Sequence, residues 1–362
     1  MNSSDDSELD SSYGSFSSTV SLDSLAVDSP RTRMKRSTLR KQKSMGAIDT
    51  KYIPKYSTIS EETPTIRTEL HRDRVASAII SRDKTRIYTS SDDSTCKIYS
   101  VESKRQLRRI ADMGDMALSS CAVIDDTSSE QNIMVVGSWD NKIYVYSIEY
   151  GKVLDIMEGH EDAISKICVR GDNLLSASWD STVKLWKCSA ESVGTTPLMT
   201  FQEHESPVHS LCMDTSGNLA VSGSEDGQIV VLDIRQKKSV ADFSAHSDVV
   251  ADVCFCGDDS QRFVSCSKDG AIKLFDVSGS EIAQFISNIP SADQAWRCLS
   301  TDGFELLSGG EDGKLYKWNV ADGSLFKIYN AHNSPMTCLN VSDDGESVVT
   351  GSKSGEILYW EK

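Results

Sequence analysis

The feature that most constrains this chain is a short polar motif that returns seven times at nearly even spacing. Two examples are SASWDSTVKLW, around Asp180, and SGSEDGQIVVL, around Asp226, and in each a predicted turn separates two apolar segments. The successive intervals are 47, 40, 46, 43, 43 and 42 residues. The centres of the seven motifs are Asp93, Asp140, Asp180, Asp226, Asp269, Asp312 and Ser354. A period near 43 residues predicts a repeat architecture in which each unit is one supersecondary element packed against its neighbours.

Each repeat also carries polar and aromatic residues at fixed distances from its centre. In the third repeat we expect His160 to bond Asp180 and Ser176. Ser176 should in turn accept the indole N–H of Trp186. A buried aspartate needs such partners, so the pattern predicts a structural network. The corresponding sets in the next two repeats are His204, Ser222 and Asp226, and His246, Ser265 and Asp269.

Three repeats lack part of this pattern. The second has neither the histidine nor the serine or threonine, and the sixth has no histidine. The seventh has Ser354 in place of the central aspartate. We therefore expect these three units to be looser than the other four.

The same residue types allow two sharper interpretations. Ser, His and Asp can form a catalytic triad, but this set recurs in several repeats and no turn resembles that of an activated nucleophile. Aspartate-rich turns can also bind calcium, but the repeat explains them better. The sequence thus favours a structural role, and we expect no enzymatic activity, no bound metal and no cofactor.

The period, the four short alternating segments per unit and the Gly-His to Trp-Asp punctuation resemble the WD40 repeat. The resemblance implies an all-β, seven-bladed β-propeller over residues 64–362. The last repeat ends after three strands. The segment TIRTELH, residues 65–71, looks like the missing outer strand, so we expect it to complete the last blade and close the ring.

The first 63 residues differ from the rest in composition. Fifteen of the first 60 are serine and few are apolar, so we predict a disordered tail. It contains the basic cluster RTRMKRSTLRKQK, residues 31–43. This cluster is either a solvated charge run, a weak contact for acidic membranes, a nuclear signal or a kinase recognition sequence. The candidate phosphorylation sites are Ser29, Ser37 and Ser44.

Charge and cysteine content restrict the class of partner and the compartment. The net charge is −16, and the first 72 residues hold nearly equal numbers of acids and bases, so the repeats are strongly acidic. Nucleic acid is therefore an unfavourable partner, and a basic peptide a favourable one. The ten cysteines include no CxxC pair, which predicts a reducing, cytoplasmic setting. The acidic N-terminus predicts no secretory signal, and the lack of a long apolar run predicts no transmembrane segment.

Two tryptophans, Trp139 and Trp179, stand in polar turns directly before the central aspartate. In WD40 propellers this position faces the narrow top surface beside the channel. The two residues fall on neighbouring blades, flanked by Asp92 and Glu225 in the same column. Either each ring packs under a neighbouring loop, or the four residues form a binding hot spot for a peptide with an apolar anchor and a positive charge. We favour the second interpretation.

Residues 70–190 carry a narrower resemblance. The stretches MALSSC, SWDNKIYVYSIEYGK and GHEDAISKICVRGDNLLSASWDSTVKLW are similar to the C-terminal propeller of the BEACH–WD40 family, to which the factor associated with neutral sphingomyelinase activation belongs. The BEACH and PH-like domains of that family have no counterpart in this sequence, so we expect either a fragment or short isoform of such a protein or a stand-alone relative. The resemblance implies an adaptor that binds a receptor tail, as between a tumour necrosis factor receptor and neutral sphingomyelinase.

A different function remains open. The segment VVLDIR, residues 230–235, approaches the WDxR ending of substrate receptors of cullin–RING ubiquitin ligases, with Leu232 in place of tryptophan. The sequence thus predicts a non-enzymatic scaffold that is associated with membranes through its partners, with the ligase receptor as the alternative.

Overall fold

The structure is a computed structural model that describes residues 59–60, 62–124, 132–189, 193–285 and 295–361. The predicted disorder of residues 1–58, the basic cluster 31–43 and the sites Ser29, Ser37 and Ser44 lie outside the described residues.

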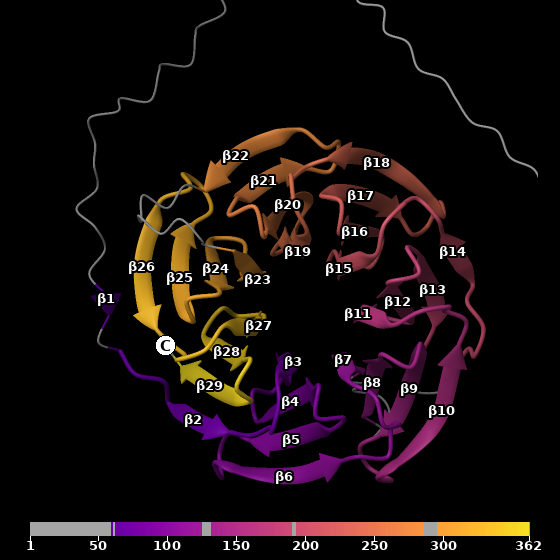
Figure 1. Cartoon of the computed structure of the whole chain (residues 1–362), viewed down its shortest axis with the longest axis vertical. Helices are drawn as coiled ribbons and strands as arrows, with labels where there is room; N and C mark the ends of the chain where they lie inside the picture. The colour runs from indigo at the N-terminus through magenta and orange to yellow at the C-terminus, as the bar shows by residue number, and fades with distance from the viewer. Residues whose placement is uncertain (1–58, 61, 125–131, 190–192, 286–294, 362) are drawn as a thin grey trace, which may run out of the picture. The chain divides into compact units, whose positions relative to one another are not determined.

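Seven sheets form a ring in which the first strand of each lies innermost, which confirms the predicted seven-bladed, all-β propeller (Figure 1). We call the four antiparallel strands of a blade a to d from the centre of the ring outward. Blades one to three are β3 (Val75–Ile80), β4 (Arg86–Ser91), β5 (Cys96–Ser100) and β6 (Arg105–Ile110); β7 (Leu118–Ile124), β8 (Ile133–Ser138), β9 (Lys142–Ser147) and β10 (Lys152–Glu158); and β11 (Ile164–Arg170), β12 (Asn173–Ser178), β13 (Val183–Lys187) and β14 (Met199–Phe201).

Blades four to six continue the same order around the ring. Their strands are β15 (Val208–Met213), β16 (Leu219–Ser224), β17 (Gln228–Asp233) and β18 (Lys238–Ser244); β19 (Val250–Cys256), β20 (Asp259–Ser267), β21 (Ile272–Asp276) and β22 (Glu281–Phe285); and β23 (Trp296–Thr301), β24 (Glu305–Gly310), β25 (Lys314–Asn319) and β26 (Leu325–Asn330).

Blade seven is built from two distant parts of the chain. Strands a to c are β27 (Met336–Val341), β28 (Ser347–Ser352) and β29 (Glu356–Glu361), and strand d is β2 (Ile66–Glu69). The antiparallel register pairs Ile66 with Tyr359 and Glu69 with Glu356. The segment expected to supply this strand thus lies beside β29, and its pairing covers an edge that would otherwise be open.

A short strand before β2 extends blade six. β1 (Ile59–Ser60) pairs in parallel with β26, opposite Ile328 and Tyr329. Glu62 then forms an ion pair with Lys327. A parallel bridge and an ion pair thus attach Ile59, Ser60 and Glu62 to blade six, ahead of the boundary expected between 63 and 64.

The b–c turns explain the spacing of the motif. The residue after each central position has a positive φ, for example 65° at Ser181 and 84° at Gly227. A Cβ on Gly227 would lie 2.1 Å from the carbonyl oxygen of His246, so this turn fits tightly against the next d–a loop. Glycine is favoured here because a left-handed backbone costs other residues about 1–2 kcal/mol.

A β-bulge interrupts the a–b pairing in every blade, one residue after the start of strand a. In blade four, Val208 pairs with Ser224 and Ser210 with Gly223, so His209 is the extra residue. The corresponding shifts occur in the other six blades. A bulge leaves the extra residue unpaired and redirects its side chain.

The apolar core lies between neighbouring blades rather than inside one. One cluster joins Tyr88 and Ile98 of blade one to Met134 and Tyr146 of blade two, and another joins blade seven to blade one. Each blade therefore depends on both neighbours for burial of its faces.

All ten cysteines are free, and burial raises the pKa of the Cys121 and Cys256 thiols to about 11.

Candidate functional site: the top face

Because the strands of a blade alternate in direction, the b–c turns and the d–a loops share one face, which we call the top face. The residue before each central position has the same backbone contact in all seven blades. The N–H of Trp139 donates to the carbonyl of Ala117 (2.9 Å), and that of Trp179 to Ala163 (2.9 Å). This shared bond holds the residue before the central position in the same place in every b–c turn.

The structure brings the two tryptophans together. Their ring centroids lie 5.3 Å apart with 46° between the planes, which is within the range of favourable aromatic pairs. Both residues are half-buried, so each ring packs against its neighbour and still presents part of its surface to solvent. The pair spans blades two and three.

A third ring continues the row onto blade four. The imidazole of His209 lies 6.1 Å from the ring of Trp179. We call Trp139, Trp179 and His209 the aromatic patch. Burial lowers the pKa of His209, although nearby Glu225 acts in the opposite direction. The ring is therefore neutral at pH 7 and can take part in stacking.

The two flanking acids differ in their environment. Arg74 donates to both oxygens of Asp92, at 2.7 and 3.0 Å, so the charge of Asp92 is already paired. Glu225 is exposed, and its Oε2 lies 3.6 Å from Nε2 of His209, beyond hydrogen-bond distance. Of the two flanking acids predicted from the sequence, Glu225 is the one available to a partner cation.

Further carboxylates surround the aromatic patch on the d–a loops of blades two to four. Asp115, Glu161, Asp162 and Glu205 are all exposed there. A partner that covers the aromatic rings would place its own charges among these acids. The arrangement favours a positively charged segment.

His209 and Arg74 were not found from the sequence. Both lie where strand a begins, and His209 is the bulged residue, so period-two alternation does not predict where its side chain points. A histidine at the start of "HSLCM" was the available signal, but an inner-strand histidine more often belongs to the core.

The polar network of the third repeat lies just below this surface. Nδ1 of His160 lies 2.7 Å from Oδ2 of Asp180, and its Nε2 lies 2.6 Å from Oγ of Ser176. The indole N–H of Trp186 donates to the same hydroxyl, at 2.8 Å. Burial alone would raise the pKa of Asp180, but hydrogen bonds from His160 and Thr182 outweigh it and hold that pKa below its usual range. These bonds anchor the turn that carries Trp179.

The fifth repeat has the same geometry, and the fourth does not. His246 lies 3.0 Å from Asp269 and 2.8 Å from Ser265. In the fourth repeat His204 contacts Ser222 at 2.7 Å, but its Nδ1 is buried without a partner among the described residues. The predicted bond between His204 and Asp226 is thus wrong.

Asp226 remains exposed, and the backbone N–H of Gln228 donates to its carboxylate. The residue before it, Glu225, is a second carboxylate, and it forms no ion pair with an arginine among the described residues. A bond between Asp226 and His204 would bury the carboxylate of Asp226, and removing that charge from water costs free energy.

The repeats that lack a histidine use a tyrosine instead. The hydroxyl of Tyr144 donates to Asp140 in blade two, and that of Tyr316 donates to Asp312 in blade six, both at 2.6 Å. Each tyrosine stands four residues after the aspartate. In blade seven, which has Ser354 at the turn, His332 contacts Glu356 at 2.7 Å.

Fold and site together define a seven-bladed β-propeller whose turns are tied by polar networks and whose top face presents aromatic rings. Five segments match the family model of the WD domain, G-beta repeat: residues 63–100, 151–187, 195–233, 237–276 and 323–361. They cover just over half of the chain, which therefore belongs to the WD40-repeat family. The unmatched units are blades two and six, where tyrosine replaces histidine.

Curated relatives share low identity over most of this chain. Autophagy-related protein 16 from Arabidopsis thaliana is 23% identical over 301 residues, 81% of this chain and 57% of its own length. The guanine nucleotide-binding protein subunit beta from Oryza sativa subsp. indica is 26% identical over 254 residues, 67% of this chain and 65% of its own. BEACH domain-containing protein B from Arabidopsis thaliana is 23% identical over 265 residues, but over only 10% of its own length. The chain thus spans less than two thirds of these relatives.

WD40 propellers act as scaffolds that bind other proteins. In the part of the chain that the structure describes, no helix is long and apolar enough to cross a bilayer.

Proposed function

We propose that this chain is a non-catalytic interaction scaffold whose aromatic patch binds an extended, basic segment of a partner protein. The observation that carries the proposal is the contact between Trp139 and Trp179, two half-exposed rings 5.3 Å apart on neighbouring blades. Two tryptophans with a free face on a polar surface are typical of an interface hot spot. The exposed acids around them favour an arginine or lysine stacked on a ring.

The experiment compares partners captured by the parent chain with those captured by the Trp139→Ala/Trp179→Ala variant. Phe304→Ala is the matched control, because Phe304 is 83% exposed and lies in the a–b loop of blade six, away from the top face. We expect the double variant to lose a specific set of partners while its melting temperature stays unchanged. An unchanged set of partners would contradict the proposal. A lower melting temperature would show that the rings are structural.

The class of ligand is tested directly by tryptophan fluorescence. An arginine-rich extended peptide should quench the parent chain and not the double variant. The same peptide with glutamate in place of arginine should bind at least about tenfold more weakly, since it meets the acids around the patch. Equal binding of the two peptides would remove the electrostatic part of the proposal.

The narrower proposal follows from the BEACH–WD40 resemblance. In that proposal the partner is the cytoplasmic tail of a receptor, as in coupling of a tumour necrosis factor receptor to neutral sphingomyelinase, and membrane association comes through that partner. The relation to BEACH domain-containing protein B supports a distant kinship of the propellers. Receptor tails among the partners lost by the double variant are the expected result.

The alternative, a substrate receptor of a cullin–RING ligase, places function at Arg235. This residue is exposed just after β17, at the end of the strand farthest from the b–c turns. Loss of ligase subunits on Arg235→Ala would favour the alternative, whereas the scaffold proposal predicts no change.

A further inference from the structure

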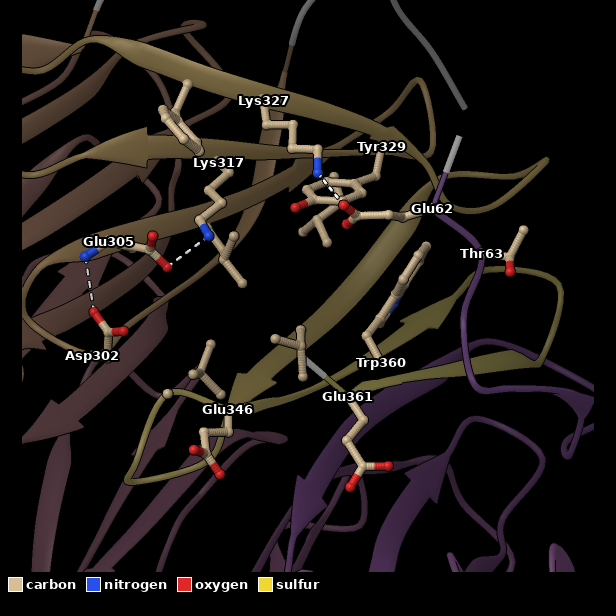
Figure 2. Close-up of a pocket in the computed structure, with 16 residues that line it drawn as sticks. Glu62, Thr63, Asp302, Glu305, Lys317, Lys327, Tyr329, Glu346, Trp360 and Glu361 are labelled. Carbon is tan, nitrogen blue, oxygen red and sulfur yellow. Dashed lines mark hydrogen bonds and ion pairs between the residues drawn. The ribbon is translucent and has the colours of Figure 1, made fainter. Parts of the chain in front are cut away.

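A pocket of about 460 Å³ lies between blades six and seven, toward the face opposite the b–c turns (Figure 2). Blade six contributes residues of β24, β25 and β26, and blade seven contributes residues of β27, β28 and β29. The apolar residues that line it are Leu307, Leu315, Phe326, Tyr329, Val341, Val348 and Trp360. Its volume and its apolar lining are typical of sites that hold a ligand.

Two aromatic rings form one wall of this inter-blade pocket. The rings of Tyr329 and Trp360 lie 5.7 Å apart at 60°, in an edge-to-face arrangement. The Nε1 atom of Trp360 is buried and has no hydrogen-bond acceptor within the described ranges. Phe326, which also lines the pocket, is 63% exposed. The pocket thus leaves an indole donor unpaired and a large apolar side chain in solvent.

The charges around the pocket are unequal. Five acids line it: Glu62, Asp302, Glu305, Glu346 and Glu361. The two lysines that line it are already paired, Lys317 with Glu305 at 2.8 Å and Lys327 with Glu62 (Figure 2).

The other three acids do not pair with these two lysines. One of them, Glu346, forms an ion pair with Lys84, which lies outside the pocket. No ion pair among the described residues includes Asp302 or Glu361. Asp302 accepts the backbone N–H groups of Phe304 and Glu305, whereas no hydrogen bond or ion pair among the described residues includes the carboxylate of Glu361. An apolar cavity with such a carboxylate at its edge is complementary to a group that is apolar at one end and positive at the other.

We propose that the inter-blade pocket is a second docking site, which takes an apolar side chain and the neighbouring arginine or lysine of an extended segment from a partner protein. The apolar side chain contacts Tyr329, Leu315 and Trp360. The basic head lies beside Glu361, which follows Trp360 at the end of β29 (Figure 2). The site is independent of the aromatic patch, since it uses other blades and the opposite side of the ring.

The test uses 19F NMR on the chain labelled with 5-fluorotryptophan, titrated with acetyl-Leu-Phe-Arg-amide. Six tryptophans give six resonances, and Trp360→Phe assigns the one of interest. We expect the Trp360 resonance to shift and saturate in the Trp139→Ala/Trp179→Ala variant as it does in the parent chain, because that variant removes the aromatic patch as a binding site. Acetyl-Leu-Phe-Glu-amide should bind about tenfold more weakly, because the charge of its last side chain is reversed.

Two variants separate binding from folding. Val341→Phe fills the pocket and should abolish the shift. Glu361→Lys changes an exposed residue and should weaken binding of the arginine peptide several-fold even if Val341→Phe folds poorly. Glu102→Lys, which reverses the charge of an exposed acid in the c–d turn of blade one, is the matched control and should leave the affinity unchanged. Any of three results would overturn the proposal. The Trp360 resonance could stay unchanged at millimolar peptide, or the two peptides could bind with equal affinity. The third result is a shift of the Trp139 and Trp179 resonances without a shift of the Trp360 resonance. The last of these results would leave the proposed function of the top face intact.

Discussion

Tyr144 and Tyr316 hold the turn aspartates in the two blades that have no histidine. A phenol hydroxyl placed four residues after the aspartate reaches the same carboxylate that histidine reaches elsewhere. Burial and the adjacent Asp140 raise the pKa of Tyr144, so the hydroxyl stays protonated and continues to donate. In these two blades the hydrogen bond to the turn aspartate thus comes from a side chain of strand c, whereas in blades one, three and five it comes from a histidine of the d–a loop.

We therefore predict that Tyr144→Phe lowers the free energy of unfolding by about 1–3 kcal/mol, the usual effect of removing a hydrogen bond to a charged group. Urea denaturation of Tyr144→Phe, Asp140→Ala and the double variant measures the coupling between the two side chains. Strictly additive effects would show that the bond contributes nothing. The expectation that blade two is loose would be supported if Tyr144→Phe had no effect on stability.

The residues of the aromatic patch differ in how far they could be predicted. Trp139 and Trp179 belong to the b–c turn, whose column follows directly from the position of the central aspartate. The direction of the His209 side chain depends on the β-bulge, and no residue type in strand a predicts that bulge. Asp226 could not be placed, because the competition between its hydration and its bond to His204 depends on the neighbouring Glu225.

At the level of strands, β2 is the element with the largest consequence. It is four residues long, yet it supplies the outer edge of blade seven. Ile66 is 6% exposed and belongs to the core cluster with Val349 and Tyr359. The sequence predicted this strand from its likeness to the outer strands of other units. It could not predict β1, because two residues carry no alternation.

We predict that Ile66→Asp releases β2 and opens the ring, whereas Ile282→Asp on β22 is tolerated. Ile282 is 50% exposed, and its strand is continuous with the rest of blade five. Burying an unpaired carboxylate and losing the side chain should cost Ile66→Asp several kcal/mol, about 3 or more.

Thermal melting and sedimentation measure the outcome. The freed edge of β29 should also promote association, so the sedimentation coefficient of Ile66→Asp should rise with concentration. Equal melting temperatures for the two variants would contradict a closing role of β2.

For the whole molecule, the buried histidines determine how stability responds to acid. Burial lowers the pKa of His71, His204, His246 and His332 below the usual 6.5, although nearby carboxylates oppose it. The unfolded chain therefore binds protons at a higher pH than the folded chain does. The contribution of these neutral, buried histidines to the free energy of unfolding is fully present above pH 6.5, and it is lost as the pH falls below that value.

We predict that the free energy of unfolding falls between pH 7 and pH 5, measured by urea denaturation at fixed ionic strength. The net charge of −16 acts in the opposite direction, because acid reduces self-repulsion. His204→Gln isolates the histidine contribution and should make the dependence on pH shallower. A stability that is constant or rises toward pH 5 would show that the histidines do not control it.

The pairing of β2 with β29 has a consequence for biosynthesis. The ribosome makes β2 before any blade exists and β29 after all the others, so strand d of the last blade waits for its partner while nearly the whole propeller is translated. At about 5–20 residues per second this delay lasts some tens of seconds. Throughout that time the nascent chain exposes a short strand with no partner. The ring can therefore be completed only after translation has passed the last repeat.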